Sequence, residues 1–383
     1  MQAWFLFLVG IVCSFISLDF FPLPWIFIAI CWSSLFIILT LRSNTPARKG
    51  VWFNLAVIVV LFGVLEIYAY LGYRGGKGYF VYNEVRYEGG YMEGYFVSND
   101  ILGYGPDKDR SITSKKFHGD KQVYDVTYTI GKDGLRITPP GSSYYNDECI
   151  ISFGGSFAFG EGVNDRDSMP YVVGTLQGRK THNFGFHGYG PHQMLAAIEN
   201  GMIHCKPKFA IYQAITGHVI RSAGYSAWDT HGPKYVMKNR HLTYSGSFDD
   251  WKNVFPWGLM ISRLEKSYFY KRFFRYFIHR YITFERDIQL FIEIVDASRR
   301  RLTEEFADVE FYVILWDNLP DDNTYLKIKE GFESRSIRYD PVSDMLPGFF
   351  EDAGKYEIDH DGHPTSTAHR LIAKYVVENI IGD

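Results

Sequence analysis

The sequence is poor in cysteine, nearly balanced in charge and without the Cys/His spacings that hold zinc. Four cysteines in 383 residues are too few for a disulfide scaffold. A formal net charge of −3, from 40 basic and 43 acidic residues, provides no electrostatic footprint for nucleic acid. No Cys/His pattern resembles a structural zinc site. We therefore expect no nucleic-acid partner, no metal site and no cofactor.

The four cysteines fall into two pairs with different settings. Cys13 and Cys31 lie in apolar segments and are expected to be buried thiols. Cys149 and Cys205 each precede a predicted strand. A bridge between these two requires their strands to be neighbours in the sheet. The sequence leaves the bridged and the reduced state open.

Aromatic residues and long apolar runs are abundant by contrast. The aromatic fraction is 17%, with 28 Tyr and 31 Phe, which is typical of membrane-interface belts and sugar-stacking surfaces. Residues 3–41 are almost continuously apolar, with a break around 19–24, and a second apolar run covers 51–72. Because about 20 apolar residues span a bilayer, we expect three membrane helices near 3–19, 23–41 and 51–72.

Positive charge in the loops orients this transmembrane region, which occupies residues 1–73. The loop 42–50 carries Arg42, Arg48 and Lys49, whereas the first turn carries no basic residue. Basic loops stay in the cytoplasm. The start of the chain also lacks the positive region of a cleaved signal peptide. We therefore expect the large domain to lie outside the cytoplasm, in the periplasm or at the outer face of a bacterial inner membrane.

One acidic residue interrupts the third apolar run. Glu66 lies beside Tyr68 and Tyr70, toward the expected outer end of the helix. We expect its carboxylate to reach the membrane interface. A role in a transport path is the alternative, because an acid inside a membrane is often functional.

The remainder reads as a small β-rich lead-in at 74–147 and a larger α/β domain at 148–383, with an insertion near 222–285. In the larger domain, short apolar runs alternate with helical patterns, which predicts a parallel sheet covered on both faces. The expected strands are at 149–153, 209–215, 310–316 and 336–342, and the expected helices are at 190–203, 287–306 and 365–381.

The insertion departs from this alternation. Residues 232–248 predict a hairpin with a polar turn at 238–240. Residues 263–281 are both basic and aromatic. One prediction is an amphipathic helix that lies on anionic lipid or on a sugar polymer. The alternative is a buried helix with a solvated basic face.

A serine at the end of the first strand of this domain is the leading candidate for chemistry. Ser156 lies in FGGSFAFGEGV (153–163), where the glycines allow a sharp turn that lifts a hydroxyl above the sheet edge. Serine is a weak nucleophile without a histidine base and an acid that orients it. The distant Asp361-Gly-His363-Pro364 supplies both. Together they predict acyl transfer through a Ser-His-Asp arrangement.

Residues 148–383 resemble the SGNH, or GDSL-type, superfamily of esterases and acyltransferases, which implies a flavodoxin-like three-layer αβα fold. GGSFAFGEGV (154–163) resembles the first block of this superfamily, with Ser156 as nucleophile. NFGFHGYGP (183–191) resembles the second and implies that the Gly188 N–H joins that of Ser156 in an oxyanion hole. DGHP (361–364) resembles the last, with His363 as base.

The sequence departs from the pattern of the superfamily at three places. Gly155 replaces the aspartate that normally precedes the serine. In TGHVIR (216–221), His218 stands where an asparagine normally completes the oxyanion hole. Its imidazole N–H can donate the same bond, or Arg221 can act electrostatically, and a purely structural histidine is the alternative reading. The third departure is the triad acid. It commonly lies three residues before the histidine, and here Asp361 is expected, with Asp359 as the alternate.

Other polar residues are expected to be structural. Arg136 lies in a turn of the lead-in, and His187, His192 and His369 are treated as surface or packing residues.

The leading hypothesis is a membrane-anchored serine esterase or O-acyltransferase, with an acylated polysaccharide or glycolipid as substrate. The acyl group is expected to be acetyl, and envelope-polysaccharide machinery is a further expected partner. The alternative is a catalytically degenerate SGNH-fold module that binds glycans or acts as a scaffold in the cell envelope. Gly155 and His218 are the residues that raise this alternative.

Overall fold

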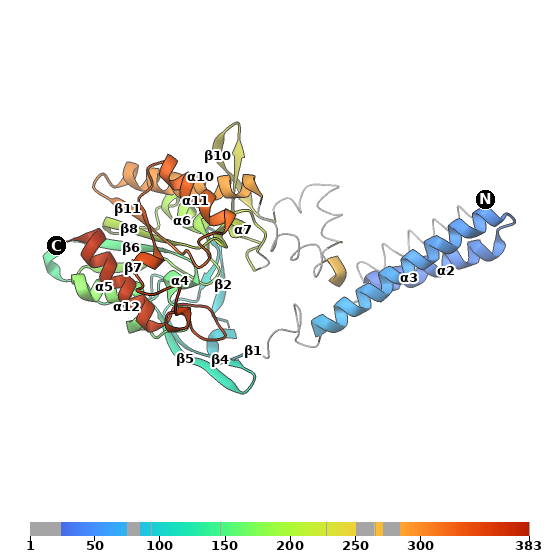
Figure 1. Cartoon of the computed structure of the whole chain (residues 1–383), viewed down its shortest axis with the longest axis horizontal. Helices are drawn as coiled ribbons and strands as arrows, with labels where there is room; N and C mark the ends of the chain where they lie inside the picture. The colour runs from blue at the N-terminus through green and yellow to red at the C-terminus, as the bar shows by residue number, and fades with distance from the viewer. Residues whose placement is uncertain are drawn as a thin grey trace. The chain divides into compact units, whose positions relative to one another are not determined.

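The computed structural model describes residues 24–74, 85–92, 94–145, 147–226, 228–249, 264, 266–270 and 284–382. The chain divides into two compact units, coloured along the sequence in Figure 1. One contains residues 1–83 and 250–282, and the other contains residues 84–249 and 283–383. The membrane helix expected at 3–19 lies outside the described residues, as does most of 263–281.

The first unit contains two long apolar helices, α2 (Pro24–Arg42) and α3 (Pro46–Arg74). They pack through a small cluster that includes Phe36, whose ring stacks on Trp52 with centroids 5.9 Å apart. Most of their other apolar side chains are exposed. Pro24–Arg42 and Pro46–Leu71 are long and apolar enough to cross a membrane, as the sequence predicted for 23–41 and 51–72.

Glu66 of α3 is buried among polar groups from a distant part of the chain. Only 2% of the residue is exposed. Its carboxylate accepts hydrogen bonds from the Ser267 hydroxyl at 2.7 Å and from the backbone N–H groups of Tyr268 and Phe269 at 2.7 and 3.0 Å. Free N–H groups at the start of a helical turn attract a carboxylate. Groups distant in sequence therefore satisfy the charge of Glu66, and the expected location of its carboxylate at the membrane interface stays a prediction.

A five-stranded parallel sheet forms the centre of the second unit. The strand order is β12-β11-β8-β6-β7, which is the flavodoxin-like order 2-1-3-4-5. All four pairings are parallel. The strands are β6 (Glu148–Gly154), β7 (Lys180–Asn183), β8 (Lys206–Ala214), β11 (Glu310–Leu315) and β12 (Tyr339–Pro341). The predicted fold class is confirmed, and the topological switch point lies between β6 and β8.

Helices cover both faces of this sheet (Figure 1). Ile150 packs with the helices on one face and its neighbour Ile151 with those on the other, as the period of two in a strand requires. The first face is covered by α5 (Met169–Gln177) and α12 (Ser366–Tyr375), which a π-helical segment (Val376–Ile381) continues. The second face is covered by α6 (Pro191–Glu199), α10 (Glu285–Glu305) and α11 (Asn323–Ser334).

Antiparallel strands from the lead-in belong to the same compact unit as this sheet. They form a three-stranded sheet in the order β1-β4-β5 and a separate β2-β3 pair. Tyr95, Tyr124 and Tyr128 join the hydrophobic core that contains Phe159 and Phe186. The strands are β1 (Val85–Glu88), β2 (Phe96–Asn99), β3 (Gly103–Pro106), β4 (Arg110–His118) and β5 (Lys121–Ile130).

The hairpin predicted within the insertion is present. It consists of β9 (Pro233–Lys238) and β10 (His241–Ser247), which pair antiparallel. Asn239 and Arg240 form its turn, with φ values of 51° and 64°, as tight hairpins of this twist require.

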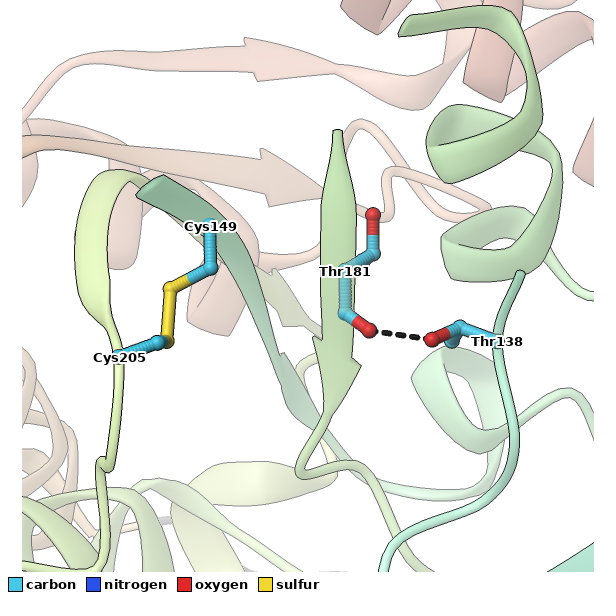
Figure 2. The surroundings of a disulfide bond; sticks show 4 residues. All are labelled: Thr138, Cys149, Thr181 and Cys205. Atoms are coloured by element: carbon cyan, nitrogen blue, oxygen red, sulfur yellow. Dashed lines mark hydrogen bonds between the residues drawn. A yellow bond between two sulfur atoms is a disulfide. The ribbon is translucent and has the colours of Figure 1, made fainter. Parts of the chain in front are cut away.

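A disulfide joins Cys149 of β6 to Cys205, which precedes β8 (Figure 2). The parallel pairing of β6 and β8 places Cys149 opposite Pro207, so the two cysteines meet with Cα atoms 6.1 Å apart. Beside this bridge, Thr138 donates a hydrogen bond to the carbonyl of Thr181 on β7. The disulfide therefore ties the amino-terminal ends of two strands, at the sheet edge opposite to Ser156.

Candidate active site

Ser156 follows β6 after a single residue, Gly155, at the carboxyl edge of the sheet and at the start of the short helix α4 (Ser156–Phe159). Ligands of such folds bind at this edge, next to the switch point. The residue is 6% exposed. The Oγ atom lies 2.8 Å from Nε2 of His363, which belongs to the loop before α12. The fold thus brings together two side chains that are 207 positions apart.

The second ring nitrogen of His363 contacts an acid. Nδ1 lies 2.6 Å from Oδ2 of Asp361. Asp359, the alternate acid, is directed elsewhere: its carboxylate is 69% exposed and pairs with Lys121 at 2.7 Å. The structure therefore places Asp361, and not Asp359, on the imidazole.

Lys116 of β4 completes this chain of contacts. Its Nζ forms an ion pair with Oδ1 of Asp361, with 9% and 0% of the two side chains exposed. Burial alone would raise the pKa of the Asp361 carboxyl, but hydrogen bonds from His363 and Lys116 hold it below its ordinary value. Sequence reasoning missed Lys116. The available signal was that the strand period places it on the same inward face as Ile112 and Ser114.

A second buried acid lies on the other side of the imidazole. Oε2 of Glu161 is 2.7 Å from Nδ1 of His187 and 3.5 Å from Nε2 of His363. Burial lowers the pKa of His187 despite this partner, so its ring is neutral at physiological pH. His187 is buried, as the packing interpretation allowed, but its bond to Glu161 was not foreseen.

Gly188 follows β7 at the same sheet edge, in the conformation that favours glycine, with φ of 74°. A Cβ atom at this position would lie 2.3 Å from Nε1 of Trp228 and 2.7 Å from the Tyr104 hydroxyl. Both groups hold the turn. Trp228 donates to the Gly188 carbonyl at 3.3 Å, and Tyr104 donates to the His187 carbonyl at 2.7 Å. Only glycine fits there.

His218 and Arg221 occupy the space that a side chain at position 155 would fill. A Cβ atom on Gly155 would lie 2.6 Å from Nη1 of Arg221 and 3.1 Å from Nε2 of His218. Both residues belong to α7 (His218–Ser222), which follows β8. The guanidinium of Arg221 and the imidazole of His218 therefore fill the space that an aspartate side chain at position 155 would need.

The surroundings of His218 determine what its ring can donate. Burial and the charge of Arg221 hold the pKa of His218 well below its ordinary value, so the ring is neutral. Its Nδ1 is 2.6 Å from the Tyr212 hydroxyl, and its Nε2 is buried without a hydrogen-bond partner among the described residues. If Tyr212 donates its proton to Nδ1, the Nε2 atom carries the ring hydrogen.

The remaining polar candidates are structural. Arg136 donates hydrogen bonds to three carbonyls at the end of α4 and in the loop that follows, a structural role as expected. His192 bonds to Asp229 at 2.7 Å, and Nδ1 of His369 accepts a hydrogen bond from the Met169 backbone at 3.2 Å. Both histidines are buried rather than on the surface.

The chain matches no protein-family model and no curated protein. Among solved structures it is similar to a proposed lipolytic protein of the G-D-S-L family from Desulfitobacterium hafniense, with 13% identity, coverage of 60% of this chain and 98% of that one, and a TM-score of 0.36. A catalytic mutant of an acetylxylan esterase from Geobacillus stearothermophilus has 12% identity, coverage of 63% and 96%, and a TM-score of 0.33. Likenesses this weak carry no argument about activity. The fold assignment stands on the strand order.

Proposed function

We propose that this protein is a membrane-anchored serine esterase or O-acyltransferase of the SGNH type that acts outside the cytoplasm. The main observation in support is the chain of hydrogen bonds from Ser156 through His363 to Asp361, at the carboxyl edge of the sheet. A serine, a histidine base and an acid that orients the base are the parts of a nucleophilic acyl-transfer site.

In the proposed reaction, Nε2 of His363 accepts the proton of Ser156 as Oγ attacks the ester carbonyl. Asp361 holds the Nδ1–H and stabilises the imidazolium that forms. The imidazolium then returns the proton to the leaving alcohol, and an acyl-serine remains. Water or a sugar hydroxyl then gives its proton to His363 and takes the acyl group, and His363 returns that proton to Oγ of Ser156. Water as acceptor yields hydrolysis and a sugar hydroxyl yields transfer.

The negative charge on the carbonyl oxygen needs fixed donors. The backbone N–H groups of Ser156 and Gly188 are proposed for this role, because both residues follow adjacent strands at one edge. His218 is proposed as the third donor, through Nε2–H, because that atom lies against Gly155, next to the nucleophile. Loss of one such donor costs acyl-transfer enzymes about 3 kcal/mol of transition-state stabilisation.

One feature supports the membrane anchor and a second supports a position outside the cytoplasm. The largely exposed apolar faces of α2 and α3 fit lipid better than water. The disulfide between Cys149 and Cys205 favours an oxidising compartment. The disulfide agrees with the orientation that the basic 42–50 loop predicts.

The proposed substrate is an acylated, in particular acetylated, polysaccharide or glycolipid of the cell surface. Trp228 supports a sugar, because it is 57% exposed and its Nε1 is bonded to the Gly188 carbonyl beside the site. A large amphipathic ring in such a position suits a sugar face.

Full-length protein in detergent tests the proposal. Ser156→Ala should abolish hydrolysis of p-nitrophenyl acetate and labelling by a serine-reactive fluorophosphonate, whereas Ser111→Ala, an exposed serine on β4, should leave both unchanged. Wild-type turnover by the Ser156 variant would refute the nucleophile. An unlabelled wild-type protein would favour the non-catalytic glycan-binding alternative. Product analysis on acetylated polysaccharide, with and without an acceptor sugar, would then separate hydrolysis from transfer.

A further inference from the structure

The loop that carries Glu161 is built to hold it in one place. Gly162 has φ of 81°, and a Cβ atom there would lie 2.4 Å from Cδ1 of Ile358. Its N–H donates to the Tyr128 hydroxyl at 2.9 Å. On the other side, Arg136 donates to the carbonyls of Phe159, Gly160 and Val163 at 2.6–2.8 Å. The position of the acid is therefore specified by backbone contacts on both sides.

The carboxylate itself is buried among polar groups. Glu161 is 6% exposed. It takes a hydrogen bond from Nδ1 of His187 at 2.7 Å, and Nε2 of His187 lies 3.4 Å from the Tyr95 hydroxyl. This network fixes the oxygen that lies 3.5 Å from Nε2 of His363. Nε2 is the atom that also faces the Ser156 hydroxyl at 2.8 Å.

This placement makes the attraction between Glu161 and His363 arise only when the imidazole takes the proton in the proposed reaction. Before proton transfer, Nε2 presents a lone pair to the serine, and a nearby carboxylate gains nothing from it. After transfer, Nε2 carries a hydrogen and the ring a positive charge, so the same carboxylate attracts it. Such attraction is strong away from water. An interaction that exists mainly after the transfer favours the transition state over the ground state.

We propose that Glu161 is a positioning residue of the site, which stabilises the protonated form of His363 through Nε2 while Asp361 holds Nδ1. This inference rests on the proposed function of Ser156 and His363. It assigns the imidazole two carboxylates, one at each nitrogen, where the sequence comparison with the SGNH pattern predicted one.

The charged and titratable groups around the imidazole set the direction in which the pKa of His363 is shifted, and this direction can be measured. Those that interact with His363 directly are Glu161, Asp361, Lys116, His187 and His369. The phenols of Tyr87, Tyr124 and Tyr128 interact in turn with the carboxylate of Glu161. Burial lowers the pKa of His363, but the carboxylates of Glu161 and Asp361 outweigh it, so the pKa lies above its ordinary value. Because the base must be neutral, activity should rise with pH through a midpoint above about 6.5.

The decisive measurement is the pH profile of Ser156 inactivation by a fluorophosphonate in the full-length protein. In that step Oγ bonds to phosphorus, fluoride leaves and His363 takes the serine proton. Glu161→Gln should move the acid midpoint of the profile down by about one pH unit, since one attracting charge is removed. Glu199→Gln is the matched control, because Glu199 lies on α6 and accepts a hydrogen bond from Tyr235 of β9, away from the imidazole. An unchanged midpoint, or a rate lowered equally at every pH, would leave Glu161 a purely structural role.

A second readout separates this inference from the proposed function. The pKa of His363 can be followed by nitrogen-15 NMR of labelled histidines, with His363→Asn for assignment. A lower pKa in Glu161→Gln supports the contact even if the wild-type serine does not react, in which case only the enzymatic proposal fails. An equal pKa in both proteins overturns the inference. If Glu161→Gln does not fold, Glu161→Asp should give a shift of the same sign and smaller size, and no shift there would also overturn it.

Discussion

Lys116 and Asp361 form a buried ion pair that links the lead-in strands to the candidate triad. The ammonium group contacts Oδ1 of the carboxylate, whose Oδ2 faces His363 at 2.6 Å. The two residues are 245 positions apart. A segment that reads as a connection between membrane and catalytic domain therefore supplies a partner of the triad acid.

Removal of this lysine should cost stability and activity together. Lys116→Met leaves Asp361 buried without one of its two partners, and breaking a buried pair in this way costs about 3 kcal/mol. We expect a lower denaturation midpoint and slower ester hydrolysis. Lys121→Met, which removes the exposed partner of Asp359, should change neither. Equal effects of the two substitutions in chemical denaturation would contradict the assignment.

The two neighbouring aspartates should behave differently. Asp361→Asn keeps the shape of the side chain but removes the charge that orients the imidazole, which in serine proteases lowers kcat by about 10⁴-fold. We expect a loss of similar order here. Asp359→Asn should retain the wild-type rate, because its carboxylate contacts Lys121 at the surface. Steady-state kinetics on a p-nitrophenyl ester compare the two. The opposite result would move the acid role to Asp359.

Gly155 should tolerate no side chain while Arg221 is present. The methyl group of Gly155→Ala would lie 2.6 Å from Nη1 of Arg221, so the substitution should lower the thermal midpoint. Removing the guanidinium in Gly155→Ala/Arg221→Ala should recover part of this loss, because the carbonyl of Tyr189, 3.0 Å from the same methyl, remains. A double-mutant cycle on thermal stability measures the coupling. Strict additivity would show that the two residues do not share this space.

The disulfide should stabilise the fold without taking part in the chemistry. Cys149 and Cys205 are 56 positions apart in the sequence. A disulfide that closes a loop of this length adds about 4 kcal/mol to the free energy of unfolding through loop-closure entropy. Cys149→Ser/Cys205→Ser should therefore unfold at lower denaturant concentration than the wild type. Below its unfolding transition it should keep its esterase rate, since the bridge lies at the amino-terminal edge of the sheet. A rate loss in the folded variant would contradict this separation.

Much of the fold could be predicted because its signals are local. The apolar runs at 149–153, 209–215 and 310–316 each became a strand of the central sheet, and their alternation with helical patterns implied parallel pairing. The four-residue strand β7 and the helices α5 and α11 were not singled out. Short elements offer too few residues for a periodic pattern to be recognised.

The polar contacts were harder to predict, since they depend on partners distant in the chain. Glu66 illustrates this, because the groups that bind its carboxylate lie about 200 positions away. Glu161 was visible in the glycine-rich motif after Ser156, yet nothing local distinguishes a buried acid from a solvated one.

By itself the sequence determined the α/β class, two apolar segments long enough to cross a membrane, and a serine and a histidine-aspartate motif placed where loops follow strands. Only the tertiary structure decided that Asp361 rather than Asp359 meets the imidazole, that Cys149 and Cys205 are bridged, and that Lys116 and Glu161 lie on the triad groups. The reason is physical. Period and composition report which face of an element is buried, whereas hydrogen bonds and ion pairs depend on distances that exist only after the sheet has brought separate segments together.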